Sequence, residues 1–295
     1  MIAIVGGLVT SVLWASTLLG SARAARLIGA WSTLGWVMLI GLAATIPLIV
    51  LTGSGVDLTP TYVGQLAVAG VANTSGLLLG YMALRRGKVA VVGPIVSTEG
   101  AISAVLAIAA GDALTATAGV LLAVVAVGVV LASFEHPSDR VVADGDTRPN
   151  PDETGRSAAV TAALAVAAAL LFGVNLFVTS RIATSALPLA WSILPARLAG
   201  FVLVSVPLVA MGRLRMSREA APFVVLVGLA EVVGIATFAL GARDSAPITS
   251  VIASQFAGIA AIAAFVLFGE RLGRVQVVGV VVIAVGVALL TATRG

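Results

Sequence analysis

Three charged side chains lie inside apolar stretches that are long enough to span a membrane: Glu99, Arg197 and Glu231. A charge at the centre of a bilayer costs roughly 2.5 to 3.5 kcal/mol on insertion scales, so such residues usually face a cavity or an opposite charge. Either carboxylate is suited to bind a cationic group of a substrate, or a proton. The alternative is a carboxylate that is held neutral, or bonded to Arg197, and only fixes helix packing.

Arg197 is the one basic residue inside an apolar run. It is expected to pair with Glu231 or Glu99, to attract a substrate carboxylate, or to extend its guanidinium to the membrane interface. A site that contains Arg197 and both acids suits a zwitterion such as an amino acid, because that molecule needs both signs of charge in one pocket.

Uncharged polar residues inside the apolar runs are candidates for hydrogen bonds to a substrate. An offset of 156 residues pairs Glu99 with Gln255 and Ser75 with Glu231, so Gln255 is the first candidate. Each of these residues is equally suited to join two helices by a hydrogen bond. Trp14 lies deeper in its run than the other tryptophans, which mark the lipid interface, and is expected to line the substrate path. The candidates are Trp14, Asn73, Ser75, Ser97, Asn175 and Gln255.

Several kinds of chemistry lack their reagents in this chain. It has no Cys and a single His, His136, so disulfides, thiolate or histidine metal sites and Cys/His or Ser/His/Asp hydrolase sites are not expected. Nothing resembles a Walker phosphate loop. The basic residues are too scattered to form a face for nucleic acid. We therefore expect no catalytic residue, no metal and no cofactor, and the chain is not expected to be an enzyme.

The composition is that of an integral membrane protein. Of 295 residues, 60% are hydrophobic and 10% are charged, and the mean hydropathy is +1.14. A span needs about 20 apolar residues, and the runs are apolar on every face rather than on alternate residues, so all should be helices. Ten segments are expected: 2–19, 30–51, 62–84, 89–110, 114–133, 158–178, 189–211, 222–240, 248–268 and 275–291.

A polar stretch divides the ten segments into five and five. Residues 134–156 hold six acidic residues, three arginines and three prolines, a composition that cannot bury a core. We expect a repeat at 1–133, a flexible linker at 134–157 and a second repeat at 158–295.

The two halves repeat each other in a conserved order. The triplet Ala-Trp-Ser at 30–32 recurs at 190–192, and Ala-Val-Gly-Val at 126–129 recurs at 284–287. An odd number of spans in each copy gives the two copies opposite orientations, as in many secondary transporters. The sequence therefore predicts an all-α integral membrane protein of ten transmembrane helices, arranged as two inverted five-helix repeats.

Basic residues are concentrated in the loops that follow odd-numbered segments. By the positive-inside rule these loops face the cytoplasm, which places both termini outside. Thirteen of the 17 basic residues lie there: Arg23, Arg26, Arg85, Arg86, Lys88, Arg140, Arg148, Arg156, Arg213, Arg215, Arg218, Arg271 and Arg274.

Short motifs recur along both halves of the chain. They are Leu13-Trp14-Ala15-Ser16, Pro94, Gly111-Asp112 and Gly128 in the first half, and Ala246-Pro247, Phe268-Gly269-Glu270-Arg271-Leu272, Gln276, Gly279 and Gly286 in the second. With these motifs, the whole chain resembles the EamA-type branch of the drug/metabolite transporter superfamily. The resemblance implies a central cavity lined by the first four helices of each half, with the fifth and tenth as a scaffold. It also implies that both termini lie in the cytoplasm, opposite to the charge rule.

The expected function is secondary transport. A small polar or amphipathic metabolite, amino acid-like or drug-like, would cross the plasma membrane by alternating access, in the direction of export, with proton coupling left open. The expected partners are this molecule and the lipid bilayer, and the protein is a monomer or a homodimer. The alternatives are a passive channel or lipid scramblase and, less favoured, a membrane-embedded enzyme. A transporter gives saturable flux, a channel gives unsaturable flux, and an enzyme gives a changed product.

Overall fold

The computed structural model describes residues 1–52, 58–110, 151–183, 187–254, 256–268 and 274–292, and isolated positions between 117 and 131. Over these residues the chain is helical and contains no strand. Six helices are long and apolar enough to cross a membrane. These two observations confirm the expectation of a helical integral membrane protein. The count of ten helices and the inverted repeat remain predictions, and most of segment 114–133 lies outside the described residues.

The first half contains α1 (Ile2–Ile28), α2 (Ala30–Thr52), α3 (Pro60–Arg86), α4 (Val89–Val96) and α5 (Glu99–Ala109). Gly29 joins α1 to α2 with a φ of 86°, a conformation that glycine adopts without strain. The start of α3 has a typical cap, because Pro60 is its first residue and the Thr59 hydroxyl accepts a hydrogen bond from the Tyr62 amide.

The second half contains α7 (Pro151–Ala183), α8 (Ala190–Gly200), the π-helix η2 (Phe201–Ser205), α9 (Val206–Ala210), α10 (Ala221–Ala253), α11 (Phe256–Phe268) and α12 (Arg274–Ala292). Two expected boundaries differ from those observed. Residues 151–157 are helical rather than part of a linker, because a proline followed by acidic residues is a favoured helix start. The predicted loop between the eighth and ninth segments is absorbed into α10.

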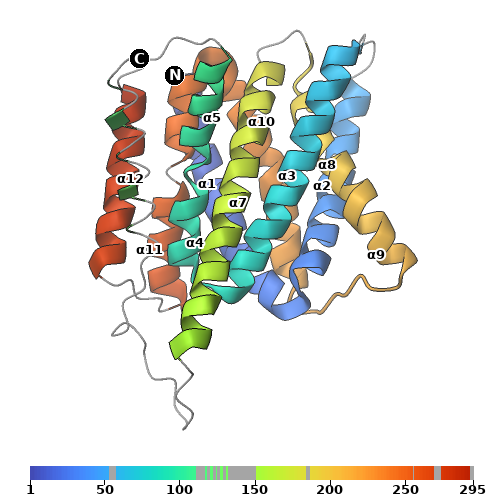
Figure 1. Ribbon diagram of the computed structural model, residues 1–295. Coiled ribbons are helices and arrows are strands. Elements are labelled where there is room, and N and C mark those ends of the chain that lie inside the picture. Colours follow the sequence, from blue (N-terminus) through green and yellow to red (C-terminus); the bar gives the residue numbers. More distant parts are fainter. Residues whose placement is uncertain are drawn as a thin grey trace.

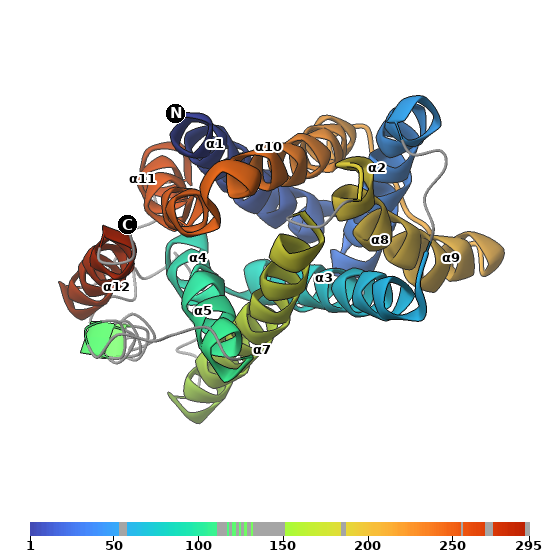
Figure 2. The ribbon, with the colours of Figure 1, turned by 90° about the horizontal axis from the view of Figure 1, so that it is seen from above.

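Helices from the two halves alternate in the bundle, as Figures 1 and 2 show: α1 lies beside α10, α3 beside α7, and α4 beside α11. The C-terminal half of α10 packs closely on α1. A Cβ at Gly6 would lie 2.7 Å from the Thr237 carbonyl, and one at Gly7 would lie 2.7 Å from the Ile252 side chain. The Ala3 amide also donates to the Asp244 carboxylate at 3.0 Å.

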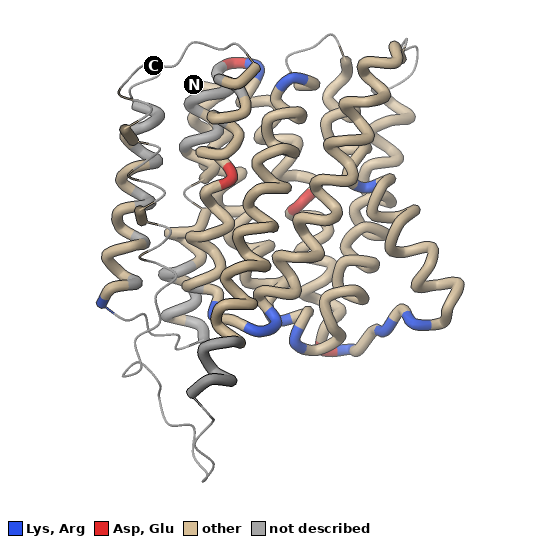
Figure 3. Tube along the Cα trace, in the orientation of Figure 1, with Lys and Arg blue, Asp and Glu red and all other residues tan. Residues whose placement is uncertain are grey.

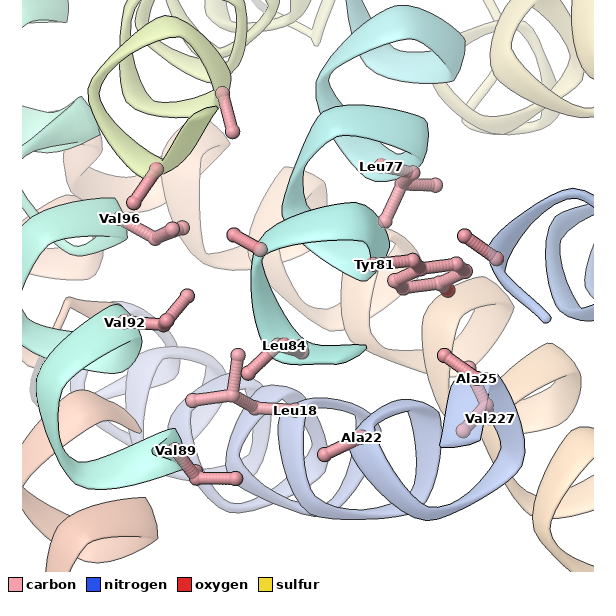
Figure 4. Packing of buried hydrophobic residues seen from close by; sticks show 14 of the residues in the cluster. Leu18, Ala22, Ala25, Leu77, Tyr81, Leu84, Val89, Val92, Val96 and Val227 are labelled. Carbon is pink, nitrogen blue, oxygen red and sulfur yellow. The ribbon is translucent and has the colours of Figure 1, made fainter. Parts of the chain in front are cut away.

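A large apolar core is formed by α1, α2, α3 and α4, with contributions from α7, η2, α10 and α11. Figure 4 shows its centre, where small residues of α1 let the larger side chains of α3 and α4 approach. Its members include Leu18, Ala22, Ala25, Leu77, Tyr81, Leu84, Val89, Val92, Val96 and Val227.

Three of the helical paths are interrupted within the bundle. The first break lies between α4 and α5, at Ser97 and Thr98, whose hydroxyls donate to the carbonyls of Pro94 at 2.8 Å and Ile95 at 2.7 Å. The second is the π-helix after α8. The third follows α10 at Ser254, which lies 156 positions after Thr98.

Charge separates along the bundle. Figure 3 shows most of the described lysines and arginines at one end, here called the basic end, while the N-terminus lies at the other end. Acidic residues also occur at mid-height.

Candidate functional site

A small cavity of about 80 Å³ lies within the bundle and draws its walls from both halves. Helices α1, α3, α4 and α5 face α7, α8, α10 and α11 across it. Of the predicted site residues, five line this cavity, called the central cavity below: Trp14, Asn73, Glu99, Asn175 and Glu231. They come from five different helices, so the fold brings together residues that are up to 217 positions apart in the sequence, from 14 to 231.

The Glu231 carboxylate is held by an arginine behind the cavity wall. Arg197 Nη2 lies 3.1 Å from Glu231 Oε2, and the Arg197 side chain is fully buried. Its other terminal nitrogen lies 3.9 Å from the Met38 sulfur. Arg197 does not line the central cavity. Of the arrangements expected from the sequence, pairing with Glu231 is the one observed.

The space for Arg197 depends on a glycine of α2. A Cβ at Gly41 would lie 2.6 Å from Arg197 Cδ, closer than real Cβ contacts. Because Gly41 has no side chain, the aliphatic part of the Arg197 side chain fits between α2 and α8.

Glu99 differs from Glu231 because no described residue forms an ion pair or hydrogen bond with its carboxylate. Glu99 is 6% exposed and lies in the first turn of α5, directly after the break at Ser97 and Thr98. Glu231 is paired with Arg197, whereas Glu99 is the carboxyl group of the cavity wall that has no opposite charge beside it among the described residues. Such an arrangement is suited to a cation.

Aromatic rings form a second part of the wall. The Trp14 ring stacks on Phe238 with 5.9 Å between centroids and meets Phe256 edge-on, also at 5.9 Å. Trp14 reaches this position because Gly234 faces it: a Cβ there would lie 2.8 Å from the indole nitrogen. Phe172 and Tyr81 also line the cavity.

Several polar atoms of the wall have no hydrogen-bond partner among the described residues. They are Asn73 Oδ1, the Tyr81 hydroxyl and Ser192 Oγ, and all three are buried. Buried polar groups are nearly always paired, so these three atoms are placed to bond a ligand or water in the cavity. The Asn175 side-chain oxygen already accepts from the Thr179 hydroxyl at 3.2 Å.

The remaining predicted positions lie elsewhere. Ser75 is half-buried on α3 and does not line the central cavity. Gln255 lies outside the described residues. Among the described residues, no three His, Cys, Asp or Glu side chains come together as a metal site would require.

Sequence reasoning missed much of the aromatic wall and several hydroxyls. A phenylalanine inside an apolar run gives no signal, because it is equally at home in lipid. Tyr81 did carry a signal, since its hydroxyl lies in a segment where a polar atom needs a partner. The missed lining residues include Thr17, Tyr81, Phe172, Thr179, Ser192, Phe238 and Phe256.

Comparisons with known proteins agree with the resemblance found in the sequence. Residues 1–134 match the model of the EamA-like transporter family, which confirms that resemblance over this part of the chain. A comparison with curated proteins finds no match. A crystal structure described only as that of a protein is similar in fold, with a TM-score of 0.65 and 16% identity, over 99% of this chain and 96% of that one.

The family match and the apolar helices together support a multi-pass membrane protein that functions in transport. The match suggests a transporter of the drug/metabolite type with a small-molecule substrate. It is consistent with the expectation that the chain is not an enzyme. The solved structure supports the fold alone.

Proposed function

We propose that the protein is a secondary transporter that binds a small organic amine in the central cavity and exports it across the plasma membrane by alternating access. The observation that carries this proposal is Glu99, a buried carboxylate in the cavity wall with no opposite charge among the described residues. A protonated amine would supply that charge, and the same carboxylate is suited to exchange a proton when the amine leaves.

The rest of the wall favours an amphipathic body on this amine. Trp14, Phe172 and Phe238 offer aromatic faces, which attract cations and apolar groups. The free polar atoms of Asn73, Tyr81 and Ser192 are available for hydrogen bonds. Arg197 is occupied by Glu231 and lies behind the wall, so the geometry favours a cation over a molecule that needs an arginine for its carboxylate.

The helix breaks support movement around this cavity. Discontinuous helices near the bilayer midplane form the sites of many inverted-repeat transporters. The breaks at Thr98 and Ser254 stand at equivalent positions of the proposed repeats, and they meet in space, because a Cβ at Gly100 would lie 3.8 Å from the Ser254 Cβ. We propose that ten helices in two inverted repeats rock about this point.

The test compares a substitution at Glu99 with the same substitution on the surface. Purified protein in proteoliposomes is screened for counterflow of radiolabelled amines, amino acids and nucleosides. We expect saturable counterflow of an amine in the wild type and in Glu219→Gln, an exposed loop carboxylate, and its loss in Glu99→Gln. The thermal stabilisation that the amine produces should disappear in the same variant.

The second candidate function is a passive channel. The same experiment distinguishes a channel from a transporter. Flux that rises linearly with concentration and shows no counterflow would favour a channel. Saturable counterflow that survives Glu99→Gln would reject Glu99 as the amine site and keep the transporter.

A further inference from the structure

A second, larger cavity of about 990 Å³ opens at the basic end, and none of the described residues that line it also lines the central cavity. The end of α1, the start of α2 and the end of α3 face η2, α9 and the loop 211–220 across it. Figure 1 shows α9 leaning away from the rest of the bundle at this end. We call this cavity the basic crevice.

Arginines line the basic crevice on both sides. Arg26, Arg85 and Arg86 lie at the ends of α1 and α3, and Arg213 and Arg215 lie in the loop 211–220 opposite them. Among the described residues that line the crevice, none is acidic. The side chains of the last four arginines have no hydrogen bond or ion pair with a described residue. Figure 3 shows basic positions along the loop that closes this end.

The side of the crevice formed by η2 and α9 also carries apolar side chains that face outward. Leu203 and Met211 are 53% and 55% exposed, and Pro207 and Leu208 lie between them. Trp31, 51% exposed, stands at the start of α2 beside the arginines. Tryptophan is typical of the level where lipid headgroups meet acyl chains.

The loop that carries Arg213 and Arg215 is held in place by hydrogen bonds. Gly212, with a φ of 62°, turns the chain after α9, and the Arg213 amide donates to the Leu208 carbonyl at 2.8 Å. The Arg215 amide donates to the Ser32 hydroxyl at 3.2 Å, and the Trp36 indole donates to the Arg215 carbonyl at 2.9 Å. The loop is therefore fixed to the start of α2, and its arginines have defined positions.

We propose that the basic crevice binds an anionic phospholipid, with the headgroup phosphate on Arg213 and Arg215 and an acyl chain along α9. Guanidinium groups bind phosphate oxygens in pairs of hydrogen bonds, and basic pockets between transmembrane helices suit anionic headgroups. A soluble phosphate compound would use the arginines but leave the exposed apolar side chains of η2 and α9 without a partner. The combination of arginines and outward-facing apolar side chains favours the lipid as the source of the phosphate. The inference does not depend on the substrate of the central cavity.

The test measures the melting temperature of detergent-purified full-length protein against three additions: phosphatidylglycerol, phosphatidylcholine and inorganic phosphate. Native mass spectrometry counts the lipid that remains bound. We expect phosphatidylglycerol to raise the melting temperature and to remain bound, while the other two have little effect. The double variant Arg213→Gln/Arg215→Gln should bind phosphatidylglycerol about tenfold more weakly or worse.

The matched control removes the same two charges from the same end. Arg23 and Arg218 are exposed and do not line the crevice, so Arg23→Gln/Arg218→Gln should keep the wild-type affinity. The double variant Arg213→Lys/Arg215→Lys keeps charge and folding but loses the paired geometry, and should bind with intermediate affinity.

Three outcomes would overturn the proposal. Equal loss of affinity in the control variant would mean attraction to general surface charge. Retained affinity in both the Gln and the Lys variants would place the lipid elsewhere. An equal effect of inorganic phosphate would assign the crevice to a soluble phosphate.

Discussion

The Arg197 guanidinium and the Glu231 carboxylate are buried together, 3.1 Å apart. Taking both charges out of water is costly, and their attraction offsets that cost only while both partners are present. Nε of Arg197 has no hydrogen-bond partner among the described residues, so the pair is not fully satisfied. We infer that the ion pair with Arg197 holds Glu231 in its position in the cavity wall.

Removing one member of the pair should destabilise the protein more than removing both. Arg197→Met leaves a buried carboxylate without its partner and should lower the free energy of unfolding by about 3 to 5 kcal/mol. The double variant Arg197→Met/Glu231→Leu should recover much of this loss. Reversible unfolding in mixed micelles measures both values. Equal losses in the single and double variants would contradict the interpretation.

At the residue scale, sequence reasoning found the charged centre of the site and missed its apolar part. Glu99 and Glu231 stood out because charge in an apolar run is costly and needs a reason. Phe172 and Phe238 did not, because the same residue type serves the lipid face and the cavity equally well.

The helices that surround the site approach one another closely where a glycine lies at the contact. On α2, Gly41 is buried and gives room to the Arg197 stem of α8, whereas Gly64 of α3 is exposed and has no heavy atom within 4 Å of an added Cβ. The two glycines are both in membrane-spanning helices, so they form a matched pair for substitution.

Gly41→Ala should displace Arg197 and weaken its contact with Glu231. Overpacking of this kind costs about 1 to 3 kcal/mol. Gly64→Ala should leave stability unchanged or slightly higher, because alanine is the better helix former. Melting temperatures of the two variants in one detergent provide the measurement, and a loss in both would show that the effect is not specific to Arg197.

At the element scale, apolar run length predicted where helices lie but not where they are interrupted. The eighth predicted segment ends at 240, yet α10 continues to Ala253 because its last turns pack on Gly6 and Gly7 of α1. The break at Ser254 likewise depends on tertiary contacts with the first half. These contacts join residues about 150 to 250 positions apart, which no local pattern encodes.

Across the whole molecule, the basic end and the N-terminus lie at opposite ends of the bundle. The positive-inside rule places the basic end in the cytoplasm, which is the orientation we propose. In contrast, the family resemblance implies that both termini lie in the cytoplasm.

Single cysteines distinguish these orientations, because the natural chain has none. Leu58→Cys lies directly before α3 on the end opposite the basic loops, and Arg218→Cys lies in the loop before α10. We expect an impermeant thiol reagent to label Leu58→Cys in intact cells and Arg218→Cys only after permeabilisation. The opposite labelling pattern would establish the family's orientation.

The sequence by itself determined that this is a helical membrane protein, that it resembles an EamA-type transporter, and that a few buried charges need partners. Those conclusions follow from composition, run length and the cost of charge in lipid, which are local properties. Only the tertiary structure decided that Arg197 pairs with Glu231 and leaves Glu99 to the cavity, and that arginines from three separate segments meet beside apolar side chains in the basic crevice. Such pairings depend on which helices become neighbours, and every apolar helix is an acceptable neighbour by composition alone.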